Sequence, residues 1–142
     1  MPKTKIKITE TDNNVLLYGI TTQLDDYKLS WLLNNKLNIS LIKTDDYLAN
    51  KKGITEELYF TAFQFTNDNN NITLVSNKAD NSIKLINIST IDFLLKINSS
   101  SINIKEFISK LRALQGIIAV TNIKNNPNIQ KKILKEITDF LK

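Results

Sequence analysis

The clearest pattern of hydrophobic and polar positions spans residues 91 to 123 and predicts a strand, a helix and a second strand. Residues 91 to 97 are a short, mostly apolar run of the kind that forms buried strands. Asn103 precedes a helix, and Glu106 three residues later completes a pattern close to a capping box. Apolar residues then recur at helical spacing and form one stripe: Ile104, Phe107, Ile108, Leu111 and Leu114. Gly116 ends the helix, and residues 117 to 120 return as a strand.

A strand and a helix are also predicted near the start of the chain. Residues 15 to 21 form the strand, and Thr22 with Asp25 resembles a capping box that opens a helix to about Leu37. One side of this helix carries Leu29, Leu33 and Leu37, and Leu32 lies between the two sides. Leu24, Tyr27 and Trp31 lie on another side, so the apolar arc is too wide for a simple surface helix.

Two explanations of this wide apolar arc stay open. Either two elements of the same chain clasp the helix, or the side that carries Tyr27 and Trp31 is left for a partner. Tyr and Trp are enriched at protein interfaces and at their energetic hot spots. The second explanation makes these two residues candidate partner-binding residues.

The middle of the chain predicts further strands. Residues 58 to 65 give the strongest strand signal, and the Asn-rich turn at 67 to 71 leads into a hairpin with residues 72 to 76. Residues 39 to 42 predict a short strand, and the polar stretch from 44 to 55 predicts a loop.

The two ends of the chain predict one edge strand and one closing helix. Lysines alternate with other residues from 3 to 9, which is typical of an edge strand with charges facing water. Pro127 after Asn126 starts an amphipathic helix over about 127–141. The apolar stripe of this helix is Ile129, Ile133, Leu134, Ile137, Phe140 and Leu141.

These elements predict a single α+β domain over residues 1–142. We expect a mostly antiparallel β-sheet of roughly five to seven strands with two to three helices packed on it. The two strand–helix–strand pieces are compatible with a ferredoxin-like or ACT-like arrangement that has an inserted hairpin.

The amino-acid composition limits the kinds of catalysis and ligand binding that we expect of the chain. The chain contains no cysteine and no histidine, so it lacks thiolate ligands, the commonest metal ligand and the commonest general base. The three glycines are widely separated and do not make a phosphate-binding loop. We therefore expect no enzyme activity, no cofactor, no metal site and no small-molecule ligand. The absence of a signal-like segment or of about 18 uninterrupted apolar residues predicts a cytoplasmic protein without a membrane partner.

The net charge of +5 allows an acidic partner such as RNA. Candidate phosphate contacts are Lys3, Lys5, Lys7, Lys131, Lys135 and Lys142. The alternative is that these lysines are a protected strand edge and a solvated helix face in a chain rich in Asn, Ile and Lys.

Asp92 is a carboxylate inside an otherwise apolar strand. It must face solvent, pair with another group, or accept backbone hydrogen bonds. It is a candidate partner-binding residue, and the alternative is a strand-entry residue satisfied by a local backbone N–H.

Three segments carry a resemblance to a known family. Residues 26 to 35 read DYKLSWLLNN and resemble the "DYRL-x-W-x-LN" segment of the IPExxxVDY family of small bacterial proteins. Residues 111 to 119, LRALQGIIA, are similar to its "LK-x-IPGI-x-A" segment. Residues 85 to 87 and 91 to 93 stand where the name motif would fall.

The chain departs from the name motif at most of its positions. Ile86 and Asn87 replace the family's Pro and Glu, Ile91 and Phe93 replace its Val and Tyr, and Asp92 alone is identical. The resemblance implies one folded unit over about residues 15–123 and names no reaction.

The sequence therefore supports two functional hypotheses. The first is a non-enzymatic interaction or adaptor module that binds a protein partner, or itself as a homodimer, through the side of Tyr27 and Trp31. The alternative is an RNA-binding accessory protein that uses the basic lysines. The first hypothesis requires that Tyr27 and Trp31 are partly exposed.

Overall fold

The computed structural model describes residues 15–51, 53–123 and 140 of the 142-residue chain. The predicted edge strand at residues 3 to 9 lies outside the described residues, and so does the predicted closing helix apart from one position. That position is Phe140, which is buried as its place in the predicted apolar stripe requires.

The described residues form an α+β fold with a six-stranded sheet in the order β2-β5-β6-β7-β1-β8, in which every neighbouring pair is antiparallel. Its strands are β1 (Leu16–Thr22), β2 (Ile42–Lys43), β5 (Ala62–Thr66), β6 (Asn70–Ser76), β7 (Phe93–Ser99) and β8 (Ile117–Asn122). A separate two-stranded ribbon consists of β3 (Tyr47–Ala49) and β4 (Leu58–Phe60). The helices are α2 (Asp26–Leu37) and α3 (Ile104–Arg112). The predicted mostly antiparallel sheet with helices packed on it is confirmed.

Two split strand–helix–strand units build the centre of the sheet. β1 and β6 are both antiparallel to β7, so they run parallel to each other with β7 between them. In the same way β7 and β8 are both antiparallel to β1, so they run parallel with β1 between them. The resulting order β6-β7-β1-β8 is that of a ferredoxin-like fold. The insertion between α2 and β6 contains β2, the ribbon and β5.

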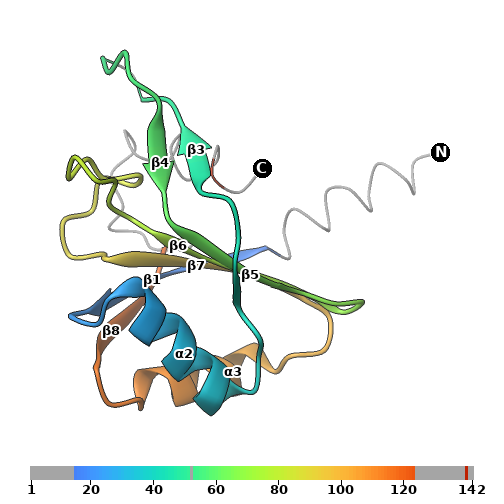
Figure 1. Ribbon diagram of the computed structural model, residues 1–142. Helices are drawn as coiled ribbons and strands as arrows, with labels where there is room; N and C mark the ends of the chain where they lie inside the picture. The colour runs from blue at the N-terminus through green and yellow to red at the C-terminus, as the bar shows by residue number, and fades with distance from the viewer. Residues whose placement is uncertain (1–14, 52, 124–139, 141–142) are drawn as a thin grey trace.

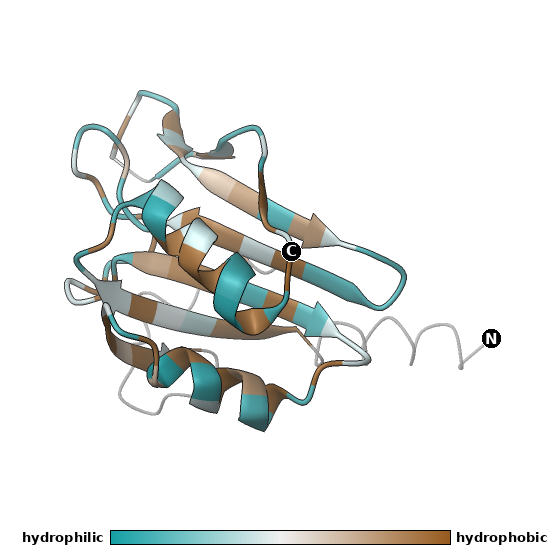
Figure 2. Ribbon diagram, turned by 60° about the horizontal axis from the view of Figure 1, so that its bottom comes forward, coloured by the Kyte–Doolittle hydropathy of each residue, from teal (hydrophilic) through white to brown (hydrophobic). Residues whose placement is uncertain are grey.

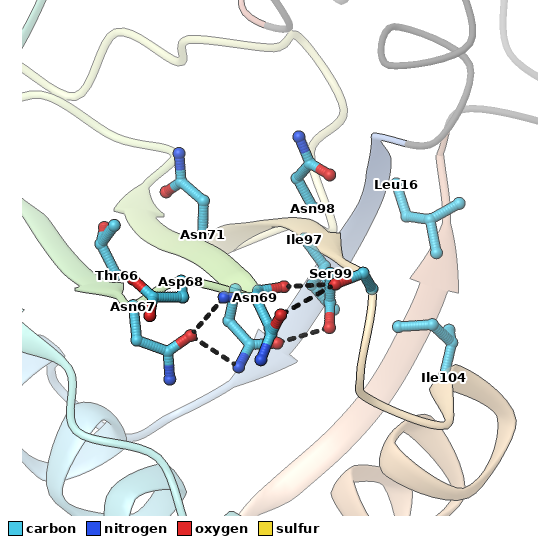
Figure 3. Close-up of a pocket in the computed structure, with 12 residues that line it drawn as sticks. Leu16, Thr66, Asn67, Asp68, Asn69, Asn71, Ile97, Asn98, Ser99 and Ile104 are labelled. Atoms are coloured by element: carbon cyan, nitrogen blue, oxygen red, sulfur yellow. Dashed lines mark hydrogen bonds between the residues drawn. The ribbon is translucent and has the colours of Figure 1, made fainter.

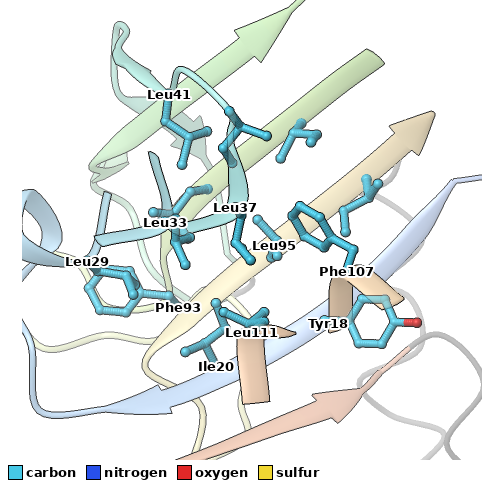
Figure 4. Packing of buried hydrophobic residues seen from close by; sticks show 14 of the residues in the cluster. Tyr18, Ile20, Leu29, Leu33, Leu37, Leu41, Phe93, Leu95, Phe107 and Leu111 are labelled. Carbon is cyan, nitrogen blue, oxygen red and sulfur yellow. The ribbon is translucent and has the colours of Figure 1, made fainter. Parts of the chain in front are cut away.

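Both helices lie on one face of the sheet (Figure 1), and they present hydrophilic residues on their outer sides (Figure 2). Their apolar sides pack on alternate residues of the strands, and Figure 4 shows part of this first apolar layer. Its helical members include Leu29, Leu33, Phe107 and Leu111. The layer forms because a strand presents every second side chain to the same face.

The caps of the helices agree with the sequence in one case and not in the other. Asn103 caps α3, since its side chain accepts the backbone N–H of Glu106 at 3.1 Å, as predicted. Asp25 caps α2 by accepting the N–H of Lys28 at 2.8 Å. The predicted cap at Thr22 is wrong, because this residue ends β1 and the chain uses the next residues to turn from sheet to helix.

A second apolar layer covers the opposite face of the sheet. It is formed by the ribbon, by the connection of residues 77 to 92, and by Phe140. Leu17, Val75 and Leu94 point into this layer from the strands. Gly19 of β1 allows close approach of the connection, because a Cβ atom at this position would collide with the side chain of Ile91.

The predicted single strand at residues 58 to 65 is wrong, because Thr61 divides it. β4 belongs to the ribbon and β5 belongs to the sheet, so Tyr59 is exposed whereas Phe63 is buried. The stretch from 44 to 55, predicted as a loop, contains β3. A local pattern shows that residues favour a strand but does not show which strand they pair with.

Candidate functional site

Tyr27 and Trp31, here called the aromatic pair, lie on an exposed side of α2. They are 64% and 66% exposed. Leu29, Leu33 and Leu37 take the buried side of the helix. The partial exposure that the interaction hypothesis requires is therefore observed, and the explanation in which the chain clasps both sides of the helix does not hold for these two residues.

The aromatic pair stands on a helix that is held firmly at both ends. The Tyr27 ring meets the buried Phe63 ring edge to face, with 5.6 Å between the ring centroids. Near the other end, the Asn34 side chain donates to the carbonyl oxygen of Leu41 at 3.1 Å and accepts its N–H at 2.7 Å. These contacts tie α2, and with it the backbone of the aromatic pair, to the sheet and to the segment after the helix.

Asp92 lies just before β7. Its Oδ2 accepts the backbone N–H of Thr22 at 2.9 Å, while its own N–H donates to the carbonyl oxygen of Ile20. The carboxylate therefore extends the pairing of β7 with β1 beyond the regular ladder. A backbone N–H does satisfy Asp92, but it belongs to Thr22, 70 positions away, and not to a local residue as the alternative supposed. A role in partner binding stays a prediction.

The six candidate lysines, Lys3, Lys5, Lys7, Lys131, Lys135 and Lys142, all lie outside the described residues. The described residues contain ten Lys or Arg and ten Asp or Glu, so their formal net charge is zero. The remaining residues carry nine basic and four acidic side chains, which accounts for the whole net charge of +5. The basic excess therefore belongs to the segments outside the described body.

Two features of the surface were not predicted from the sequence. Leu48 and Tyr59 are cross-strand partners in the ribbon, and both are exposed. A hollow of about 590 Å³ also lies at the end of the sheet where the β5–β6 turn meets the end of β7 (Figure 3). Its amides largely bond within the protein: Asn67 Oδ1 accepts from the Asn69 N–H and from the Asn70 side chain. These bonds close the Asn-rich turn that the sequence did predict.

Comparison with models of protein families gives no match for this chain, and comparison with curated proteins gives none. The resemblance to the IPExxxVDY family therefore stays a prediction that rests on the three sequence segments. Within the described ranges, no group of three or more acidic side chains is placed to hold a metal ion. Neither α2 nor α3 has the length and apolar character needed to cross a bilayer.

Proposed function

We propose that the protein is a non-enzymatic interaction module of the cytoplasm, which binds a protein partner or a second copy of itself through the aromatic pair. The observation that carries this proposal is the exposure of Tyr27 and Trp31, one helical turn apart, at 64% and 66%. Tyr and Trp are the residues most enriched among interface hot spots, where a few side chains supply most of the binding free energy.

The size of the exposed rings makes them an effective anchor. An aromatic side chain buries roughly 150–250 Å² when it is covered, so two thirds of that area contributes about 3 kcal/mol per ring at about 25 cal/mol per Å², from which the costs of association are subtracted. The contact between the Tyr27 and Phe63 rings lowers the entropy that the Tyr27 side chain loses on binding. The pair therefore supports an interaction of moderate affinity.

The surroundings of the aromatic pair favour a protein surface as the partner. Asn34 and Asn35 follow on the same side of the helix, and neither side chain is charged. The cores of protein interfaces are depleted in charged residues and enriched in aromatic ones. A second copy of the chain also fits this side of α2, with the exposed Lys28 beside the aromatic pair, since the rims of interfaces are polar.

Trp31→Ala tests this proposal against Tyr59→Ala, which removes an exposed aromatic side chain from the ribbon instead. Light scattering across a range of concentrations reports self-association, and co-purification with a tagged chain followed by mass spectrometry reports a protein partner. We expect Trp31→Ala to abolish whichever association the unchanged protein shows and Tyr59→Ala to preserve it. If both variants keep the oligomeric state and the co-purified proteins of the unchanged chain, the aromatic pair is not the binding surface.

RNA binding is the second candidate function, and the segregation of charge favours it. The basic excess lies wholly in the segments outside the described body, as expected if the neutral body carries basic segments that contact phosphates. The test replaces Lys3, Lys5, Lys7, Lys131, Lys135 and Lys142 by Gln and follows binding of a labelled single-stranded RNA against salt.

Loss of six phosphate contacts should reduce the slope of log affinity against log salt by about 4, at about 0.7 per contact. Replacement of the exposed Lys28, Lys36 and Lys78 by Gln is the control and should leave the slope unchanged. No binding of the unchanged protein at low salt would remove this function.

A further inference from the structure

Tyr18 of β1 is buried beneath α3 except at its hydroxyl group. The residue is only 8% exposed, and within the described part of the chain no hydrogen-bond partner accompanies its Oη atom. Figure 4 shows the hydroxyl at the margin of the first apolar layer, directed away from the leucines of the core. Among the described residues no fully buried side-chain nitrogen or oxygen lacks a partner, so the Oη atom reaches the surface and can donate a hydrogen bond to a ligand there.

The Tyr18 hydroxyl borders a hollow of about 360 Å³ between α3 and the strands β1 and β8, here called the α3 hollow. Ile104 and Ile108 of α3 give it apolar walls, and its polar lining comes from Tyr18, Lys105, Arg112 and Asn122. This volume lies at the lower end of the range of small-molecule sites, which combine apolar walls with a few convergent polar groups.

The charged groups of the α3 hollow are both basic. Arg112 is anchored at the rim, because its Nη2 atom donates to the carbonyl oxygen of Val120 at 3.1 Å. Lys105 is exposed, and none of the described residues that line the hollow is acidic. Glu106 of the same helix is instead paired with Lys110, with 3.1 Å between the charged atoms. A hydroxyl, an ammonium and a guanidinium group thus surround one small volume, and all three donate hydrogen bonds.

We propose that the α3 hollow binds a small organic anion. Its carboxylate or phosphate group accepts hydrogen bonds from the Tyr18 hydroxyl and from Lys105 and Arg112, and its apolar part packs against Ile104 and Ile108. The bound anion supplies the acceptor that Tyr18 lacks within the described protein. This site does not depend on the role of the aromatic pair, which lies on a different helix.

The test uses the full chain and two anionic probes, benzoate and phenyl phosphate, with benzyl alcohol as the neutral control. Amide NMR spectra are recorded while each probe is added up to about 10 mM, which detects dissociation constants in the millimolar range. We expect saturable shifts at α3 and near Tyr18 with at least one anion and affinity at least about tenfold weaker for benzyl alcohol. The ratio of the two anion affinities distinguishes a carboxylate ligand from a phosphate ligand.

Three variants locate the site. Tyr18→Phe keeps the buried ring and removes the hydroxyl, so affinity for the anion should fall about tenfold, the effect of one hydrogen bond to a charged group. Lys105→Gln should weaken binding about threefold, because an exposed cation contributes less. Lys110→Gln removes the same charge from the same helix away from the hollow and should leave the affinity unchanged.

Each contrary result overturns the proposal. Absence of saturable shifts with both anions would show that the hollow is not a ligand site, and equal binding of benzyl alcohol would show that charge plays no part. Equal weakening by Lys105→Gln and Lys110→Gln would assign the effect to the general charge of the surface. Unchanged affinity in Tyr18→Phe, with a native amide spectrum, would contradict the proposed site, because the anion would then not contact the hydroxyl.

Discussion

Asn77 is a fully buried amide that holds the long connection between β6 and β7 in place. Its Nδ2 atom donates to the carbonyl oxygens of Ile86 at 2.9 Å and Ile91 at 3.0 Å, and its Oδ1 atom accepts the N–H of Ile86 at 2.8 Å. All three bonds are buried, so water cannot replace them at low cost. One side chain therefore positions the segment whose apolar residues cover the sheet.

Asn77→Asp should lower the free energy of unfolding by at least about 3 kcal/mol. The carboxylate cannot donate the two hydrogen bonds that the amide gives to the carbonyl oxygens of Ile86 and Ile91, and it places a negative charge beside them. Asn81→Asp is the matched control. The Asn81 side chain uses only its oxygen, which accepts the N–H of Ile83 at 3.3 Å, and the residue is exposed. Chemical denaturation should place the control within about 0.5 kcal/mol of the unchanged protein. Similar losses in both variants would contradict the role given to Asn77.

Lys96 of β7 is partly buried in the sheet, with its Nζ atom 5.5 Å from the centroid of the Phe140 ring. Desolvation by burial lowers the pKa of this lysine below its ordinary value of 10.5. Between the lowered pKa and 10.5 the unfolded chain binds more protons than the folded one, so the contribution of Lys96 to stability rises with pH in that window.

Lys96→Met keeps most of the side-chain volume and removes the titrating group. The free energy of unfolding of this variant should rise less with pH, between the lowered pKa and 10.5, than that of the unchanged protein. Lys28→Met removes an exposed charge and should keep the full rise. Denaturation midpoints measured from about pH 8 to about pH 10.5 make the comparison. Parallel curves for Lys96→Met and the unchanged protein would show that Lys96 has the same pKa in both states.

At the scale of elements, the start of α2 depends on Asp25 rather than on Thr22. Asp25→Ala should destabilise the protein by about 1 kcal/mol, because the N–H of Lys28 loses its acceptor. Asp25→Asn keeps an amide oxygen in the same place and should lose only a few tenths of a kcal/mol, the electrostatic part of the interaction with the helix dipole. If thermal unfolding shows that Asp25→Ala and Asp25→Asn lose the same stability, the charge of Asp25 and not its capping hydrogen bond stabilises the helix.

The sequence predicted the elements whose apolar spacing is long and regular. The helical spacing of apolar residues and the capping pattern predict α3 with its cap at Asn103. The Asn-rich turn predicts the hairpin of β5 and β6. The division at Thr61 and the existence of β3 did not follow, because both depend on which distant strand each short segment meets. The place of Thr22 was also missed, since its hydroxyl donates to the carbonyl oxygen of Gly116, 94 positions away.

The candidate functional residues could also be predicted only where the local sequence marks them. The wide apolar arc of α2 indicated that Tyr27 and Trp31 were unusual, and the structure exposes them. Nothing near Tyr18 or Asn77 in the sequence marks them out, because Tyr18 occupies an ordinary strand position and Asn77 follows a strand as many turn residues do. Their importance arises from α3 and from residues 86 and 91, which folding brings beside them.

At the scale of the whole molecule, the sheet is covered on both faces. α2 and α3 cover one face, and the ribbon, the connection and Phe140 cover the other. A partner of the described body therefore contacts the outer sides of the helices, the outer side of the ribbon or a sheet edge. Stacking of RNA bases on an open sheet, as aromatic strands allow in other folds, does not fit this arrangement.

The two apolar layers share no residue, because the strands send alternate side chains to opposite sides. We therefore expect the second apolar layer, with residues 77 to 92 and the ribbon, here called the cover, to unfold locally while the sheet with α2 and α3, here called the base, stays folded. Native-state hydrogen exchange should accordingly resolve two cooperative units, with amides of residues 77 to 92 and the ribbon opening at a lower free energy than those of β1, β7 and α3. If all of these amides open with the same free energy, the cover and the base unfold together as one cooperative unit.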